Sequence, residues 1–467
     1  MSAAKIPLAD FALPLPDSAR QALARAWLWL GLLSLICSGV FSVLLVLSRT
    51  PVLQNLFPVA DFFHVALVAH VDLSVLVWFI AIAGMLWSIN SSTHAMSWDW
   101  LALWGCALGV ALMSLAPFIG RGDPIMANDI PVLNDPIFIS GLLVFGAGFA
   151  ALVLRSLVLA PVLGLGFDGG GALRFGLNAA AVSAAVAILA FAWSYAAVPA
   201  SLGGKAYYEI LFWGGGHALQ FTWTLLMLVA WIWLISACGA RVPLSPRVAL
   251  LMFLLALVCV FVTPYAYLAY GVASVEHRNL LTWAMRFGGG LAILPMSLAV
   301  LVALRPAAEV RDDARPLRAA LISSVVLFAV GGVIGIFISG NNVKIPAHYH
   351  GSIVGVTLAL MGLVYHLLPQ LGYAAPVGRL ATWQPIVYAA GQLMHITGLV
   401  WSGGYGVQRK VGGAEQVLRT SGEIAGMGLM GLGGAIAIVG GLLFVVVVLR
   451  AMRNPAIASG VLSAARR

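Results

Sequence analysis

The sequence predicts an all-α polytopic membrane protein, a bundle of about twelve transmembrane helices with both termini in the cytoplasm. Of the 467 residues, 62% are hydrophobic and 9% are charged, whereas a soluble domain has about 25% charged residues. The apolar residues form runs of about 20, the length that crosses the hydrocarbon layer of a bilayer as a helix. We therefore expect a single domain, residues 1–467, in the lipid bilayer of the cell inner (plasma) membrane.

Short polar turns separate the apolar runs from one another. The predicted spans are residues 27–48, 62–88, 98–118, 136–160, 175–197, 209–237, 247–272, 279–304, 317–339, 347–369, 380–402 and 424–450. The polar stretches between them stay under about 20 residues, which is too short for a linker between membrane domains.

The basic residues predict the orientation, because Lys and Arg are retained on the cytoplasmic side. With both termini inside, 16 of the 25 basic residues lie in cytoplasmic segments and nine in outer segments. The acidic residues lean the other way, since Asp123, Asp129 and Asp135 share one outer loop. The net charge of +9 is therefore explained by topology, and we expect no nucleic-acid partner.

The four cysteines exclude two kinds of redox centre from this chain. Cys37, Cys106, Cys238 and Cys259 are isolated, without a CxxC or CxxCH motif. Without these motifs we expect neither covalent haem attachment nor a thiolate copper centre in this chain. Such centres would have to be carried by an accessory subunit.

Four histidines from three predicted helices share one level near the outer face. His70 lies about 12 Å below the outer end of the second span at about 1.5 Å per residue, and His217 lies at a similar depth in the sixth. His348 and His350 follow just below the outer face in the tenth span. Ionisable side chains inside a membrane are costly and are therefore functional candidates.

His348 and His350 cannot bind the same metal ion. Residues two positions apart on a helix lie about 200° apart around its axis. Neutral imidazole is a good axial ligand for haem iron, so the layer predicts two haems held side by side. His395, on the outer half of the eleventh span, has no assigned role.

Residues 331–369 contain the motif Ala347-His348-Tyr349-His350. This segment resembles the ninth and tenth helices of subunit I of the haem-copper oxidase superfamily. The resemblance extends over all twelve spans. It implies that His348 is the axial ligand of a high-spin, substrate-binding haem. It also implies that His70 and His350 are the two ligands of a low-spin haem.

Two further segments are similar to motifs of this family. Residues 212–217 are similar to its sixth helix, which implies that His217 is the first ligand of a second metal, either copper or non-haem iron. Residues 406–410 are similar to the loop after its eleventh helix, which implies that Arg409 and Lys410 bind the haem propionates. Guanidinium and ammonium groups suit anionic propionates.

The chain departs from the family at the second metal. Family members carry an adjacent histidine pair at the end of the seventh helix, whereas this chain has only Glu276 and His277 a few residues later. In one interpretation both join His217 in a mixed nitrogen and oxygen set that suits iron better than copper. In the other, they form a solvated turn and the second metal is weak or missing.

A tyrosine of some family members is also replaced, because position 221 is Phe221. Other members have a tyrosine on the seventh helix instead. Tyr265, Tyr267 and Tyr270 are available there, and Tyr270 is the catalytic candidate.

The resemblance implies a respiratory haem oxidoreductase that takes electrons from cytochrome c or a quinol and reduces O2, with accessory subunits carrying haem c or copper. Nitric oxide reduction with non-haem iron is the alternative, favoured by the missing histidine pair, the missing tyrosine and the scarcity of acids inside the spans, where Asp72 stands alone. A non-catalytic haem protein for electron transfer or gas sensing predicts two haems without a second metal. A secondary transporter with histidine proton relays predicts no haem.

Overall fold

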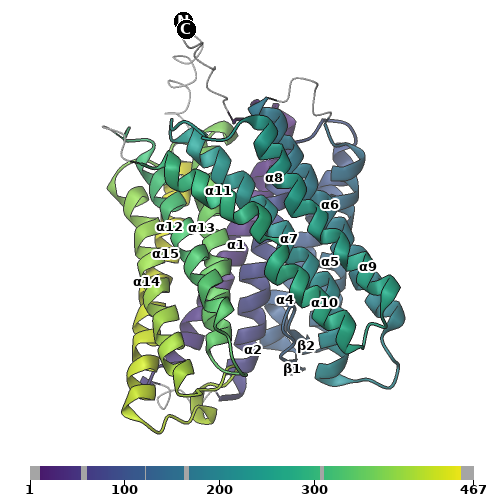
Figure 1. The fold of residues 1–467 in the computed structure, drawn as a ribbon, viewed down its shortest axis with the longest axis vertical. Helices are drawn as coiled ribbons and strands as arrows, with labels where there is room; N and C mark the ends of the chain where they lie inside the picture. The colour runs from purple at the N-terminus through teal and green to yellow at the C-terminus, as the bar shows by residue number, and fades with distance from the viewer. Residues whose placement is uncertain (1–10, 54–59, 121, 162–167, 306–309, 454–467) are drawn as a thin grey trace, which may run out of the picture.

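The computed structural model describes residues 11–53, 60–120, 122–161, 168–305 and 310–453, which form a bundle of long helices (Figure 1). A short antiparallel hairpin joins β1 (Asp123–Ile125) to β2 (Val132–Asn134). It lies at the lower end of the bundle in Figure 1, in the predicted outer loop.

In the described residues the chain forms twelve helical rods, nine of them single helices and three of them interrupted. The single helices are α1 (Ser18–Arg49), α4 (Met96–Ile119), α5 (Pro136–Val158), α6 (Gly169–Ala197), α7 (Gly204–Ala237), α12 (Arg315–Ile336), α13 (Lys344–Leu367), α14 (Arg379–Gly404) and α15 (Ser421–Arg453). The interrupted rods are α2 (Ala60–Val71) with η2 (Asp72–Val77) and α3 (Trp78–Ile89), α8 (Pro246–Val258) with η3 (Cys259–Phe261) and α9 (Val262–Ala269), and α10 (Val275–Gly288) with α11 (Gly290–Ala303). Short 3₁₀ turns follow at η4 (Pro369–Leu371) and η5 (Gly413–Glu415).

Eleven rods within the described part of the chain are long and apolar enough to cross a membrane. The remaining rod, α14, has 26 residues but contains Gln384, Gln392 and His395, which are buried polar side chains. The predicted all-helical bundle of about twelve spans is thereby confirmed, and the polar residues of α14 become candidates for a site inside the bundle.

The interruptions have local causes. Pro264 has no N–H and its ring crowds the carbonyl one turn earlier, so the rod tightens to a 3₁₀ turn at η3 before α9. Three consecutive glycines, Gly288 to Gly290, separate α10 from α11. After His70 the helix widens into the π-helix η2, where the carbonyl of His70 accepts hydrogen bonds from the hydroxyls of Ser74 at 2.6 Å and Ser38 at 3.1 Å.

Glycines let α13 lie directly against α12, while other glycines bring α14 against α15. A Cβ added to Gly351 of α13 would lie 2.5 Å from the Cα of Gly331 on α12. A Cβ added to Gly398 of α14 would lie 2.4 Å from the backbone nitrogen of Met430 on α15. Small residues allow such close approach within a membrane. Because α13 also contacts α14, its histidines have a helix on either side.

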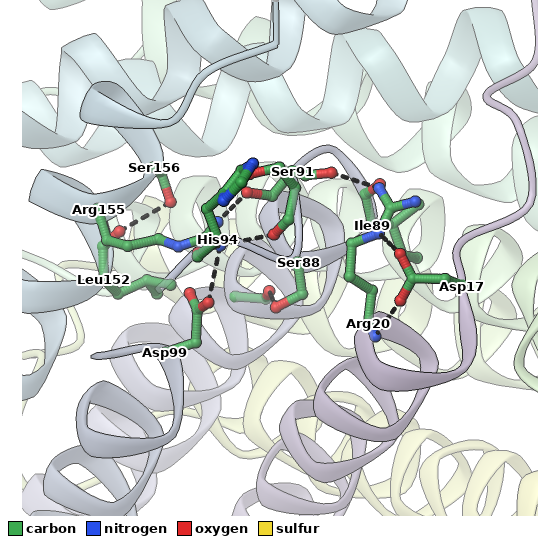
Figure 2. Close-up of polar contacts among 12 residues, drawn as sticks. Asp17, Arg20, Ser88, Ile89, Ser91, His94, Asp99, Leu152, Arg155 and Ser156 are labelled. Carbon is green, nitrogen blue, oxygen red and sulfur yellow. Dashed lines mark hydrogen bonds and ion pairs between the residues drawn. The ribbon is translucent and has the colours of Figure 1, made fainter. Parts of the chain in front are cut away.

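A buried ion pair holds the end of the bundle opposite the hairpin. Arg155 of α5 lies 2.9 Å from Asp99 of α4, with both side chains buried. The same guanidinium donates to the carbonyl oxygens of Ser92 and His94 at 2.8 and 3.0 Å and to the hydroxyl of Ser91, as Figure 2 shows. One side chain therefore fixes the turn between α3 and α4.

Basic residues of α1 bind carbonyl oxygens at the same end. Arg20 donates to the carbonyl oxygen of Ile89 at 3.2 Å and pairs with Asp17, which caps α1 (Figure 2). Arg25 donates to the carbonyl oxygen of Leu371 at 2.6 Å. These bonds stabilise the first turns of α1, which begins about two turns before its predicted apolar run. They also bring the start of α1 beside the ends of α3 and α13.

Candidate haem and metal site

The two histidines of the Ala-His-Tyr-His motif point to different neighbours. His348 turns toward α12, where its Nδ1 lies 2.7 Å from the carbonyl oxygen of Gly331. His350 turns toward α14, where its ring centroid lies 4.6 Å from that of His395. His70 of α2 lies within electrostatic range of His350. The divergence agrees with the angle expected for a spacing of two on a helix.

Four imidazoles of this region share one hydrogen-bonding pattern. In each, Nδ1 faces a backbone carbonyl oxygen, and because a carbonyl can only accept, Nδ1 carries the proton. The Nε2 lone pair is then free, which is the arrangement that metal-binding histidines use. The distances are 3.1 Å from His70 to Ser38, 2.7 Å from His348 to Gly331, 2.8 Å from His217 to Trp213 and 2.9 Å from His395 to Met430.

The surroundings of the predicted haem ligands fit a haem. His70, His348 and His350 lie among the helices and yet keep partly exposed side chains, so their rings have room for a ligand. The ring of His348 is seated on Gly335, where an added Cβ would lie 2.8 Å from Nδ1. Oriented imidazoles with free Nε2 atoms and open surface are what axial ligation of haem iron requires.

The predicted propionate-binding pair lies over this layer. The backbone N–H of Val343, at the start of α13, donates to the carbonyl oxygen of Val407 at 3.0 Å, which holds the loop after α14 against α13. Arg409 and Lys410 follow in that loop, and both donate to Oδ1 of Asn128 at 3.0 Å. Among the described residues neither cation has an ion pair with a carboxylate, so the pair is suited to an anion.

Burial and a neighbouring cation disfavour the charged form of Lys410. Burial, and to a lesser extent the neighbouring Arg409, lowers the pKa of Lys410 to about 8. A bound carboxylate would raise this pKa again, since an opposite charge favours the ammonium form. The loop therefore holds a cation that an anionic group would stabilise.

The structure separates Glu276 from His277. The side chain of His277 is buried, with 1% of its surface exposed, and lies within electrostatic range of His217. Its two ring nitrogens have no hydrogen-bond partner among the described residues. Glu276 is exposed. The expectation that both residues form a solvated turn is wrong for His277, and the expectation that Glu276 points toward His217 is not met. Ser274 caps α10, and successive residues of this helix lie about 100° apart around its axis, so the two side chains do not share a direction.

Tyr267, rather than Tyr270, lies beside this histidine. The ring of Tyr267 meets the ring of His277 edge-on at 4.7 Å, and its hydroxyl lies 2.6 Å from the hydroxyl of Ser194. Tyr270 is 38% exposed, because α9 ends at Ala269 and the chain turns outward. The structure therefore does not bring Tyr270 to the candidate site.

A second metal has few ligands at this position. Within the described part of the chain no group of three His, Cys, Asp or Glu side chains is close enough to hold a metal ion. Asp129, from the outer loop between β1 and β2, reaches 3.7 Å from Nδ1 of His217. Burial raises the pKa of Asp129 to about 6, partly offset by His217. The three-histidine set of the family is therefore not reproduced.

Sequence reasoning missed Asp129 and Gln392 as members of the site. No sequence pattern marks Asp129 as a site residue, because only the fold brings this loop residue to a helix that is distant in sequence. A pattern does mark Gln392 and His395, since polar residues three positions apart share a helix face and both lie within an otherwise apolar run.

Comparison with known proteins agrees with this architecture. The family described as "Cytochrome C and Quinol oxidase polypeptide I" matches residues 22–443. An uncharacterized protein of Rickettsia prowazekii is 28% identical, covering 92% of this chain and 95% of that protein. An uncharacterized protein of Aquifex aeolicus is 29% identical, covering 77% of this chain and 88% of that one.

The fold is also similar to that of a heme-copper terminal oxidase dimer solved by cryo-EM. That match has a TM-score of 0.70 at 17% sequence identity and covers 94% of this chain and 84% of that chain. The family match spans most of the helices, and the fold similarity extends over nearly the whole chain. The chain is therefore a multi-pass membrane protein that belongs to the cytochrome c and quinol oxidase polypeptide I family, the subunit I family of haem-copper oxidases.

Proposed function

We propose that this chain is the haem-bearing subunit of a respiratory oxidoreductase that takes electrons from cytochrome c or a quinol and reduces O2. The observation that carries the proposal is the group of imidazoles on α2 and α13. Carbonyl oxygens hold Nδ1 of His70 and of His348, and the ring of His350 packs against His395. Family membership supports a terminal-oxidase type of reaction.

The residues have distinct tasks in this proposal. His70 and His350 would together hold a low-spin haem, and His348 would hold a high-spin haem. When bound, these groups would supply one-electron transfer and the binding of a diatomic gas. Arg409 and Lys410 would bind the propionates through charge-assisted hydrogen bonds.

Backbone carbonyl oxygens orient two of these imidazoles, those of His70 and His348. Gly331 holds the His348 ring against α12, and Ser38 holds the His70 ring against α1. A ligand whose ring is already oriented loses less freedom on binding iron, and a hydrogen bond at Nδ1 makes Nε2 a better donor. The chain itself would therefore set which iron receives two ligands and which receives one.

Electrons need a partner to enter the chain, which has no CxxCH motif of its own. We propose an accessory subunit carrying haem c or copper, or direct oxidation of a quinol, in the cell inner (plasma) membrane. We assign no step to a second metal, because His217 and His277 are the two buried imidazoles available for it and no third ligand completes a group in the described residues.

Nitric oxide reduction is the second candidate function. The observation that favours it is the carboxylate of Asp129 beside His217. A carboxylate oxygen is a hard donor that suits iron better than copper, so a metal held near these residues would be non-haem iron. Phe221 in place of a tyrosine favours the same chemistry.

The assignment of the ligands is tested by haem spectra of the purified protein and of three single variants. Wild type should contain two haems, of which one binds carbon monoxide. His348→Ala should lose carbon monoxide binding and keep the low-spin spectrum. His70→Ala and His350→Ala should lose the low-spin spectrum and keep carbon monoxide binding.

His366 offers a matched control, since it lies on α13 near the opposite end and its substitution by Ala should leave both spectra unchanged. Wild-type protein without haem would overturn the proposal and favour a transporter. If the protein contains two haems but consumes neither oxygen nor nitric oxide when a chemical reductant is supplied, a role in electron transfer or gas sensing would be favoured instead.

A further inference from the structure

The polar face of α14 meets the predicted low-spin ligand. Gln392 and His395 are three residues apart and so lie on one side of the helix. The ring of His395 lies 4.6 Å from the ring of His350, and the side chain of Gln392 approaches the same imidazole. Two polar side chains of one helix therefore converge on His350.

His350 differs from the other predicted haem ligands in its hydrogen bonding. His70 and His348 each give the Nδ1 proton to a backbone carbonyl oxygen. Within the described residues no backbone carbonyl takes this place for His350. When Nε2 of His350 binds iron, its Nδ1–H needs an acceptor, since metal-binding histidines almost always have one.

The side-chain oxygen of Gln392 is a hydrogen-bond acceptor that has no partner among the described residues. Gln392 is 8% exposed, and its Oε1 is buried with no hydrogen bond of good geometry to any residue in the described ranges. A buried acceptor that stays unpaired is unfavourable, so the structure gains when a donor reaches it. The Nδ1–H of His350 is the donor at hand.

His395 is held too firmly to compete for this proton. Its own Nδ1 donates to the carbonyl oxygen of Met430 at 2.9 Å. A Cβ added to Gly433 of α15 would lie 2.3 Å from the backbone nitrogen of His395, so α14 already lies directly against α15 at this position. His395 therefore packs against the His350 ring and limits its rotation.

We propose that Gln392 is a positioning residue of the low-spin haem site, its Oε1 accepting a hydrogen bond from Nδ1–H of His350 while His395 fixes the plane of that ring. The inference rests on the proposed function, because it concerns a haem bound by His350. A hydrogen bond at Nδ1 raises the basicity of the imidazole and stabilises the oxidised iron, which lowers the reduction potential.

The test is a spectroscopic redox titration of the low-spin haem in the purified full-length protein. Gln392→Leu removes the acceptor and should raise the potential, shifting the reduction equilibrium up to about tenfold, which corresponds to about 59 mV for one electron. Gln392→Glu keeps a carboxyl oxygen in the same place and should leave the potential at or below that of wild type. Both variants should keep two haems.

Gln384→Leu is the matched control. Gln384 is a fully buried glutamine of the same helix, bonded to Tyr365 at 3.0 Å and to the carbonyl oxygen of Gly440 at 3.1 Å. It lies about 12 Å along the helix from Gln392 at about 1.5 Å per residue. Its substitution should lower thermal stability and leave the low-spin potential unchanged.

The outcomes separate this inference from the proposed function. A Gln392→Leu protein with two haems and the wild-type potential would overturn the inference alone. If that variant does not fold, a Gln392→Glu protein whose potential lies above wild type would overturn it equally. Wild-type protein without haem would overturn the proposed function and this inference with it.

Discussion

Gly335 illustrates how one absent side chain seats a candidate haem ligand. The His348 ring lies on Gly335, and its Nδ1 reaches the carbonyl oxygen of Gly331 one turn earlier. Any Cβ at position 335 would lie 2.8 Å from Nδ1 and 2.9 Å from Cε1 of that ring. The orientation of the predicted high-spin ligand therefore depends on a residue that contributes no chemistry of its own.

Gly335→Val is expected to abolish carbon monoxide binding and to leave the low-spin spectrum intact, because the His348 ring must leave its seat while His70 and His350 stay in place. Optical spectra of the reduced protein with and without carbon monoxide measure both effects. Gly332→Val is the control, since a Cβ at Gly332 meets nothing within 4 Å. Unchanged carbon monoxide binding in Gly335→Val would contradict this role of the glycine.

Sequence reasoning at the residue scale was accurate where a motif fixed the spacing and inaccurate where a loop intervened. The divergence of His348 and His350 follows from helix geometry alone. Tyr267, and not the predicted Tyr270, lies beside His277, because α9 ends between the two tyrosines. Helix ends are the least predictable part of a helix. Glu276 turns outward for a similar reason, since the capping of α10 by Ser274 sets which neighbour faces inward.

At the scale of elements, the turn between α3 and α4 depends on charge. Arg155 and Asp99 are buried side chains on two different helices, and the guanidinium also serves the backbone of the turn (Figure 2). Removing one partner of a buried ion pair costs about 3–5 kcal/mol, because the other charge stays uncompensated. We therefore regard this pair as the main polar contact between α4 and α5.

Arg155→Met should lower the apparent unfolding temperature of the detergent-solubilised protein by several degrees, measured by thermal denaturation. Arg311→Met supplies the comparison, because the Arg311–Asp313 pair is exposed and exposed pairs contribute little. Equal unfolding temperatures for Arg155→Met and wild type would show that the buried pair adds no net stability.

The sequence predicts the long helices, but it predicts only some of their interruptions. Apolar runs predict helices in a membrane because every backbone polar group must be paired there. The break at η3 follows from Pro264, which the sequence displays. The π-helix η2 depends on hydroxyls of Ser38 and Ser74 meeting one carbonyl oxygen, a contact between two helices that no local pattern contains.

For the whole molecule, the arrangement of the helices turns scattered residues into one site. His70, His217, His350 and His395 come from four different helices, and the loop carrying Arg409 and Lys410 lies against the start of α13. Depth along each span predicts a common level for His70, His217, His348 and His350, whereas the reach of Asp129 from the hairpin loop could not be predicted. Because the ligands of the family's second metal are not reproduced in the described residues, the proposal depends mainly on the claim that this chain binds two haems.

The most direct test of that claim is the amount of iron, copper and extractable haem per chain in the purified protein, measured by elemental mass spectrometry and haem extraction. We predict two irons per chain, both as haem. A third iron or a copper would mark a second metal near His217 and leave the claim intact. Fewer than two haem irons per chain, in protein that is folded and fully purified, would contradict it.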